Sequence, residues 1–317
     1  MKISIKSLSV ILLAQLALIA YLQTQSSSTA AFKKTQNLLA VNFDDVNQVE
    51  IFDADKKKIT LKEDAGKWNL PELKGFPVSS KKIEEFLTKV KEAKRSWPVG
   101  KTLSSAKQFS VVDEQFERKL VFSKNGDVKS TLFVGTSPSF RKVHVRVDGE
   151  DLTYTMELNT YELPTKMSHW FDKDLYRLEK SKTEEILFKD FSLQNKEGDF
   201  VLAELGQDEQ MDKAKTKTLS SLAVHPTFED VLDFSQKSLS LASGVFQYSV
   251  RMKSGESIVF DFSEYRQNLK EENKKNKEEI AKDFLALKVS STPYYFKVRK
   301  SRIEQLLKPL AQKSPYH

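Results

Sequence analysis

The chain of 317 residues contains no cysteine, only 10 glycines and only four histidines. Without cysteine it cannot form disulfides, thiolate metal sites or a thiol nucleophile, and it lacks the lipidated cysteine of a bacterial lipoprotein. The histidines, His144, His169, His225 and His317, lie far apart and none is paired at metal-ligand spacing. The phosphate-binding loop, the dinucleotide-binding fingerprint and the serine nucleophile elbow are missing as well. We therefore predict that the protein is not an enzyme and has no metal or cofactor.

The net charge of +7 comes from residues spread over the whole chain. Nucleic-acid-binding proteins concentrate their basic residues on one face, so this distribution argues against a nucleic-acid partner. A dispersed positive charge fits better with weak attraction to anionic lipid headgroups in a tethered protein.

The N-terminal segment predicts export. Lys2 and Lys6 precede an uncharged, mostly apolar run over residues 8–22, which is the pattern of a signal sequence. We interpret residues 1–31 as a signal anchor or transmembrane helix of a bacterial inner-membrane protein. The positive-inside rule then places the N-terminus in the cytoplasm and the body in the periplasm. Cleavage near Ala31 is the alternative.

The body repeats itself at an offset of about 130 residues. Val49-Glu50-Ile51 and Gly66-Lys67-Trp68 recur as Glu185-Ile186-Leu187 and Gly198-Asp199-Phe200. We predict two tandem copies of one domain-sized unit, over residues 40–172 and 180–312.

Each copy is rich in strand patterns and hairpin signals and contains few helical ones, which predicts an α+β fold with antiparallel sheets. In each copy a middle helix and a closing helix are expected, over 78–90 and 158–170 in the first and near 211–224 and over 301–312 in the second. The expected strands are 46–52, 57–63, 67–70, 117–123, 128–134, 142–147 and 152–157 in the first copy and 184–188, 191–195, 199–204, 246–252, 257–262, 285–289 and 294–298 in the second.

The second copy contains a charged insertion over residues 264–284. Its composition suits a solvated helical excursion or a mobile loop, and the alternative is an arm that docks onto a partner. The possible partner contacts in this segment are Tyr265, Arg266, Leu269, Lys274 and Lys277.

Two further polar features have ordinary explanations. His144 lies in the alternating segment 143–147, which predicts a half-exposed strand histidine. Asp44-Asp45 precedes the first strand, where acids are typical of a turn or a strand start.

Several motifs together resemble a known family. They are Phe43-Asp44-Asp45, Gly66-Lys67-Trp68, the segment Leu132-Phe133-Val134-Gly135-Thr136-Ser137-Pro138 and the segment Val143-His144-Val145-Arg146-Val147-Asp148-Gly149. This set resembles the bacterial domain-of-unknown-function family 4340, over most of residues 40–205 and more weakly over the second copy. The resemblance implies an envelope protein with an N-terminal anchor, of the kind associated with ABC-2-type exporters and gliding-motility-like transporter subunits. It implies no catalytic residue.

We therefore expect a membrane-tethered periplasmic accessory subunit of an ABC-type transporter or envelope complex, acting by protein–protein contact on a permease or another envelope membrane protein. A periplasmic binding module for a glycan, peptide or lipid, using the cleft between the two copies, is the alternative. A hydrolase with scattered carboxylates is a third possibility. Co-purification from membranes would favour the first, and a ligand retained through purification would favour the second.

Overall fold

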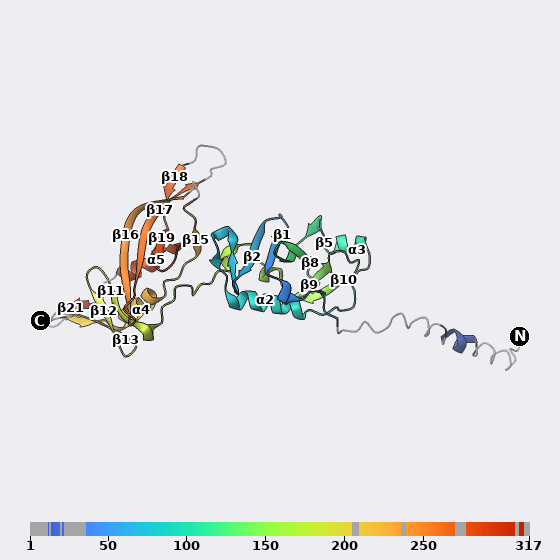
Figure 1. The fold of residues 1–317 in the computed structure, drawn as a ribbon, viewed down its shortest axis with the longest axis horizontal. Helices are drawn as coiled ribbons and strands as arrows, with labels where there is room; N and C mark the ends of the chain where they lie inside the picture. The colour runs from blue at the N-terminus through green and yellow to red at the C-terminus, as the bar shows by residue number, and fades with distance from the viewer. Residues whose placement is uncertain are drawn as a thin grey trace. The chain divides into compact units, whose positions relative to one another are not determined.

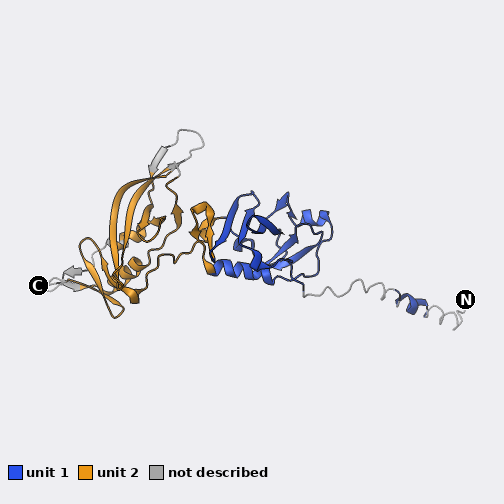
Figure 2. Cartoon of the chain, viewed as in Figure 1, with its two compact units in different colours: residues 1–66, 81–165 blue, residues 67–80, 166–317 orange. Residues whose placement is uncertain are grey.

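A computed structural model describes Leu12, residues 14–19, Tyr21 and residues 36–204, 209–235, 239–269, 277–307 and 311–313. These residues form a mixed α+β fold of antiparallel sheets with few helices (Figure 1). The chain divides into two compact units (Figure 2). Unit 1 comprises residues 1–66 and 81–165, and unit 2 comprises residues 67–80 and 166–317. The short segment 67–80 thus belongs to unit 2, although it lies inside the range expected for the first copy.

Unit 1 is built on an antiparallel sheet in the order β10-β9-β8-β7-β1-β2. The strands are β1 (Gln48–Asp53), β2 (Lys58–Asp64), β7 (Arg118–Lys124), β8 (Asp127–Val134), β9 (Lys142–Val147) and β10 (Thr153–Glu157). Helix α2 (Ser80–Glu92) buries Ile83, Phe86 and Val90, which recur at helical spacing. The Phe86 ring stacks on Phe122 of β7 with their centroids 6.5 Å apart, so this apolar stripe is what attaches α2 to the sheet.

The β7–β8 hairpin has the turn that its sequence predicts. Asn125 and Gly126 both have positive φ, at 52° and 91°. A two-residue turn with two positive φ values matches the right-handed twist of the strands, and asparagine followed by glycine adopts it at the lowest cost. Positive φ also occurs at Ala65-Gly66 in unit 1 and at Glu197-Gly198 in unit 2, two turns that lie at corresponding positions of the predicted repeat.

A small cap covers one end of the unit 1 sheet and was not expected from the sequence. It consists of α3 (Leu103–Gln108), β5 (Val111–Val112) and β6 (Gln115–Phe116). Thr102 begins α3 with a capping box shared with Ser105. Buried residues of the cap form one cluster with Phe133 of β8, so the cap is part of the core of unit 1.

Unit 2 is built on a second antiparallel sheet, in the order β13-β12-β11-β16-β17-β19-β20-β15, with β18 paired to β17. The strands are β11 (Thr183–Leu187), β12 (Ser192–Lys196), β13 (Asp199–Leu202), β15 (Asp230–Leu232), β16 (Leu239–Met252), β17 (Ser257–Leu269), β18 (Lys277–Ile280), β19 (Phe284–Val289) and β20 (Tyr295–Arg299). Unit 2 also contains the pairs β3 (Lys67–Leu70) with β4 (Phe76–Pro77) and β14 (Glu209–Met211) with β21 (Ala311–Lys313).

Helix α4 (Lys213–Val224) begins at Asp212, whose carboxylate accepts a hydrogen bond from the backbone N–H of Lys215. The helix is held to the sheet by its last turn, where the hydroxyl of the buried Tyr248 donates to the carbonyl of Ala223 at 3.0 Å. An aromatic core fills the rest of unit 2. In it Tyr176 lies edge-on to Phe296, with their centroids 4.7 Å apart, and Phe228 contacts both rings.

The two sheets have corresponding strands in the same order. Unit 1 runs β10-β9-β8-β7-β1-β2, and unit 2 runs β20-β19-β17-β16-β11-β12. In both, the hairpin pair that follows the helix, β7–β8 or β16–β17, lies directly beside the first strand of the sheet, β1 or β11.

Neither closing helix forms as expected. Residues 158–170 contain two short 3₁₀ helices, η4 (Thr160–Glu162) and η5 (Met167–His169). Pro164 lies between them and cannot donate the hydrogen bond that a continuous helix needs. The second region begins as α5 (Lys300–Ile303) and η7 (Glu304–Leu307), but the chain is again a strand at β21.

Most of the expected N-terminal anchor lies outside the described residues. Leu12, residues 14–19 and Tyr21 are helical and exposed. In the part of the chain that the structure describes, no helix has the length and apolar character to cross a membrane.

Candidate functional site

The most distinctive surface of unit 2 is an extension of the β16–β17 hairpin, which we call the arm. It comprises residues 239–247 of β16, residues 263–269 of β17 and β18. Strands β16 and β17 pair with each other from Arg251↔Ser257 at the turn to Leu239↔Gln267 in the arm. Beyond it, β18 adds to the other side of β17 from Arg266↔Ile280 to Leu269↔Lys277. Figure 1 shows β16 and β17 as the longest strands of the unit, running up to β18.

The outer edge of the arm has no neighbouring strand among the described residues. Strand β11 pairs with β16 only from Thr183↔Met252 to Leu187↔Ser249. From Tyr248 back to Leu239, β16 is hydrogen-bonded to β17 alone. Two irregularities, between Leu241 and Gly244 and between Gly244 and Phe246, interrupt this stretch. Such bulges twist an edge strand and hinder its pairing with a strand of another chain.

Apolar side chains are exposed along the arm. Leu241 is 44% exposed, Val245 is 48% exposed and Ile280 is 42% exposed. No charged residue occurs in β16 before Arg251. A group of exposed apolar residues on one projecting element is typical of a surface that contacts another protein.

The base of the arm is packed into unit 2. Tyr265 is only 1% exposed and lies in a buried cluster with Leu232, Ala281 and Ala286. Next to it, Lys300 Nζ lies 3.3 Å from the carboxylate of Glu264. The arm is therefore anchored by a tyrosine that serves the core.

These observations correct the interpretation of residues 264–284. The described parts, 264–269 and 277–280, are strands and not a helix, because residues 264–269 continue an existing ladder and tertiary pairing outweighs helix propensity. Of the five expected contacts, Tyr265 is buried and Arg266 is exposed. Leu269 and Lys277 pair with each other at the end of the β17–β18 ladder, and Lys274 lies outside the described residues.

At its base the arm borders an open pocket of about 550 Å³. Phe188, Val245 and Phe246 are among its lining residues. Phe188 stacks on Phe191 with their centroids 4.5 Å apart and also contacts Phe246 at 6.2 Å. The pocket therefore offers partly exposed aromatic rings at the point where the outer edge of β16 becomes free.

The sequence contained a signal for this surface that was overlooked. Leu239 and Leu241 alternate with small polar residues, and Val245 continues the apolar character beyond Gly244. We expected the strand to begin only at 246. Ser243 and Gly244, residue types that usually mark a turn, lie shortly before it. Here they belong to the irregular part of a longer strand.

His144 was predicted to be half-exposed from the alternation of residues 143–147, but the structure buries it in a structural environment. It lies in β9, is 8% exposed, and its Nδ1 lies 2.9 Å from Thr136 Oγ1. Its ring stacks on Phe109 of the cap at 4.1 Å. Burial lowers the pKa of His144 below its ordinary value of 6.5, so the imidazole is neutral at pH 7 and packs the cap onto the sheet.

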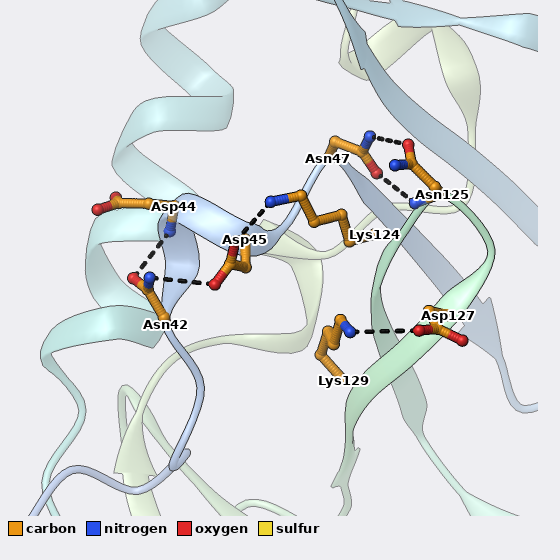
Figure 3. A network of polar contacts seen from close by, with 8 residues as sticks. All are labelled: Asn42, Asp44, Asp45, Asn47, Lys124, Asn125, Asp127 and Lys129. Carbon is orange, nitrogen blue, oxygen red and sulfur yellow. Dashed lines mark hydrogen bonds and ion pairs between the residues drawn. The ribbon is translucent and has the colours of Figure 1, made fainter.

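Asp44 and Asp45 lie in a polar network that holds the start of β1 against the β7–β8 turn (Figure 3). Asp45 accepts hydrogen bonds from Lys124 Nζ and Asn42 Nδ2. The Lys124 ammonium lowers the pKa of Asp45 through the hydrogen bond and through its charge. The carboxylate of Asp44 points away from Asp45 in Figure 3. The two acids do not converge, and they belong to a 3₁₀ turn, η2 (Phe43–Asp45).

The same network fixes the hairpin turn. Asn47 Nδ2 donates to Asn125 Oδ1 at 2.7 Å, and the backbone N–H of Asn125 donates to Asn47 Oδ1 at 2.9 Å. Among the residues that the structure describes, no group of three or more histidine and acidic side chains is placed to hold a metal ion.

Comparison with known proteins gives one family match. The model of the family described as Domain of unknown function (DUF4340) matches residues 68–242. This range includes parts of both units and ends within the first residues of the arm. No curated protein matches the chain, and no solved structure matches it.

Proposed function

This chain belongs to the DUF4340 family, whose model matches more than half of its length, and from that membership we propose that it is a membrane-tethered periplasmic accessory subunit of an ABC-type transporter or envelope complex. In this proposal it acts by protein–protein contact, and the arm of unit 2 is the contact surface. The partner is a permease or another membrane protein of the envelope.

The observation that carries this proposal is the exposed apolar character of the arm. Leu241, Val245 and Ile280 each expose more than two fifths of their surface. Tyr265 is buried at the base, where it holds the arm on the sheet. Contact with a partner would remove these apolar side chains from water, and this favours binding.

The proposed tether rests on the N-terminal sequence. Lys2 and Lys6 flank an uncharged run at 8–22, and the described residues in this run are helical and exposed. A segment of this kind would hold the body at the outer face of the inner membrane, near any membrane-embedded partner.

We also propose that the two sheets arose by duplication of one unit, over residues 40–172 and 180–312. The support is the matching strand order, the middle helices α2 and α4, and the paired positive-φ turns at Ala65-Gly66 and Glu197-Gly198. A duplicated scaffold leaves one copy free to acquire a new surface, and here that surface is the arm.

The experiment is photocrosslinking in cells. A photoreactive amino acid is placed at Val245 in the arm, and at Val128 of β8 in unit 1 as a matched control. Val128 is an exposed strand valine with 63% exposure. We expect Val245 to crosslink to an integral membrane subunit of an ABC-type transporter and Val128 not to do so.

A second variant tests the same surface without crosslinking. Leu241→Ser combined with Val245→Ser should reduce co-purification of that subunit by about tenfold, since hot-spot residues each contribute more than about 1 kcal/mol. If the crosslink occurs equally from Val128, or if the double variant retains its partner fully, the arm is not the contact surface.

A further inference from the structure

Unit 2 contains a second concave site, separate from the arm. It is a pocket of about 310 Å³ formed between α4 and β13. Phe200 and Val201 of β13, together with Met211, supply its apolar surface. Phe200 is buried, whereas Val201 and Met211 are partly exposed. The volume is at the lower end of the range for small-molecule sites.

Three lysines surround this apolar surface. Lys213 and Lys217 come from α4, and Lys180 comes from the segment before β11. The ammonium group of Lys180 donates a hydrogen bond to Ser221 Oγ at 2.8 Å, which ties this side chain to the same helix. None of the three lysines forms an ion pair with any residue that the structure describes.

Carboxylates near the pocket do not balance this charge. Among the described residues that line it, Asp199 is the one acid. Asp212, one residue before α4, is already engaged, because it caps the helix and pairs with Lys215 at 3.3 Å. The described lining residues therefore carry an excess of positive charge, whereas those of the larger pocket in unit 1 include equal numbers of basic and acidic residues.

The arrangement costs free energy in the unoccupied protein. Lys213 and Lys217 are four residues apart on one helix, so their side chains are neighbours, and like charges at this spacing destabilise a helix. A multivalent anion would remove this repulsion and gain hydrogen bonds from ammonium groups. A lysine cluster of this kind suits a phosphate group, and the apolar surface beside it suits a short hydrocarbon part of the same molecule.

We propose that this pocket binds a phosphate monoester with an attached apolar group. The phosphate lies among Lys180, Lys213 and Lys217, and the apolar group lies against Phe200, Val201 and Met211. Either a soluble organic phosphate or the headgroup of a phosphatidate-type lipid has this chemistry. The inference goes beyond the proposed function, since it involves none of the residues of the arm.

The test is calorimetric titration of the full chain, held in phosphatidylcholine nanodiscs, with hexyl phosphate. Hexanol and inorganic phosphate are titrated separately. We expect hexyl phosphate to bind at least about tenfold more tightly than inorganic phosphate, because only hexyl phosphate uses both parts of the pocket. Hexanol should give no saturable binding.

A second preparation, in nanodiscs that also contain phosphatidate, identifies the source of the ligand. Weaker binding of hexyl phosphate there indicates that the lipid headgroup occupies the pocket. Unchanged binding indicates a soluble organic phosphate. Both results support the site.

The decisive variant is Lys213→Gln with Lys217→Gln, which keeps helix-forming side chains and should weaken binding of hexyl phosphate by about tenfold or more. Its matched control is Lys81→Gln with Lys91→Gln, which removes the same charge from exposed positions on α2 and should leave binding unchanged. A single Val201→Glu variant, made independently, should also abolish binding by placing a carboxylate in the pocket. Absence of binding by the wild type, or equal binding by the Lys213/Lys217 variant and its control, overturns the proposal.

Discussion

The β7–β8 hairpin of unit 1 and the β16–β17 hairpin of unit 2 occupy the same place in the strand order of their sheets. The strands of the first hairpin have 7 and 8 residues, and those of the second have 14 and 13. In unit 1 the chain before the hairpin forms the cap, which packs on Phe133. In unit 2 the corresponding chain forms β15, which pairs with β20.

The difference shows how one strand order supports two kinds of surface. Where the preceding connection folds back over the hairpin, the end of the sheet becomes part of the core. Where that connection joins the far side of the sheet, the hairpin extends, and Leu241 and Val245 are exposed on the added part. The contact surface that we propose therefore depends on the path of a connection and not on the sheet itself.

Substitution at the base of the arm should reduce the stability of the protein most. Tyr265→Ala removes a buried aromatic ring and should lower the free energy of unfolding by about 3–5 kcal/mol. Urea denaturation followed by the fluorescence of Trp68 and Trp170, both in unit 2, measures the effect. The control, Arg266→Ala, changes the next and exposed residue and should alter stability by less than about 0.5 kcal/mol. Equal stabilities of the two variants would mean that the arm is not anchored by packing.

The stability of unit 1 should depend on glycine at position 135, beside the cap, whereas the arm should tolerate a side chain at position 244. A Cβ on Gly135 would lie 2.0 Å from the carbonyl oxygen of Phe109, whereas a Cβ on Gly244 would have no atom within 4 Å. Gly135→Ala should therefore destabilise unit 1 by about 1–3 kcal/mol, and Gly244→Ala in the arm should be close to neutral. Denaturation midpoints measured by circular dichroism compare the two. A loss of stability from Gly244→Ala as large as that from Gly135→Ala would show that other atoms pack as closely around the arm as around the cap.

A substitution in the β7–β8 turn of unit 1 should cost more stability than one in the β16–β17 turn of unit 2. Asn125 has a φ of 52° and exchanges two hydrogen bonds with Asn47. Asn125→Ala should cost about 1–2 kcal/mol in the free energy of unfolding. Ser254, which precedes Gly255 in the unit 2 turn, does not have a positive φ, so Ser254→Ala should cost less than about 0.5 kcal/mol. Similar losses from both variants would contradict the structural difference between the turns.

The smallest expected effect is a pH dependence of the cap. Burial lowers the pKa of His144 in the folded state below 6.5, so the unfolded chain takes up a proton first as pH falls. The contribution of His144 to stability is thus present above pH 6.5 and is lost as pH falls toward the folded-state pKa. Urea denaturation between pH ~7 and pH ~5 should show this loss, and His144→Gln should reduce the slope. An unchanged slope in His144→Gln would assign the pH dependence to other groups.

Much of the fold could be predicted because its signals are local. The turn at Asn125-Gly126 and the apolar stripe of α2 each act within a few residues, and each formed where expected. Hairpins connect neighbouring segments, so adjacent strand patterns also predicted antiparallel pairing.

The wrong predictions share one cause: contacts with residues distant in sequence determined the local conformation. Residues 264–269 contain good helix formers, yet they extend β17 because β16 and β18 offer backbone partners. The cap was missed because α3, β5 and β6 are too short for periodicity to reveal, and packing against Phe133 is what makes them stable. The burial of Tyr265, which was predicted to be a possible partner contact, has the same cause: no pattern in the sequence shows that Leu232, Ala281 and Ala286 surround it.

Local sequence signals were enough to predict the antiparallel α+β class, the resemblance to the family and the turn at Asn125-Gly126, since glycines, asparagines and apolar periodicity act on neighbouring residues. Tertiary contacts determined which hairpin is capped and which extends, that Tyr265 is a core residue, and that Lys180 borders the same pocket as Lys213 and Lys217. These outcomes depend on which segments meet in space. The burial and the electrostatic surroundings of a residue depend on both segments that form a contact, and a local sequence pattern includes only one of them.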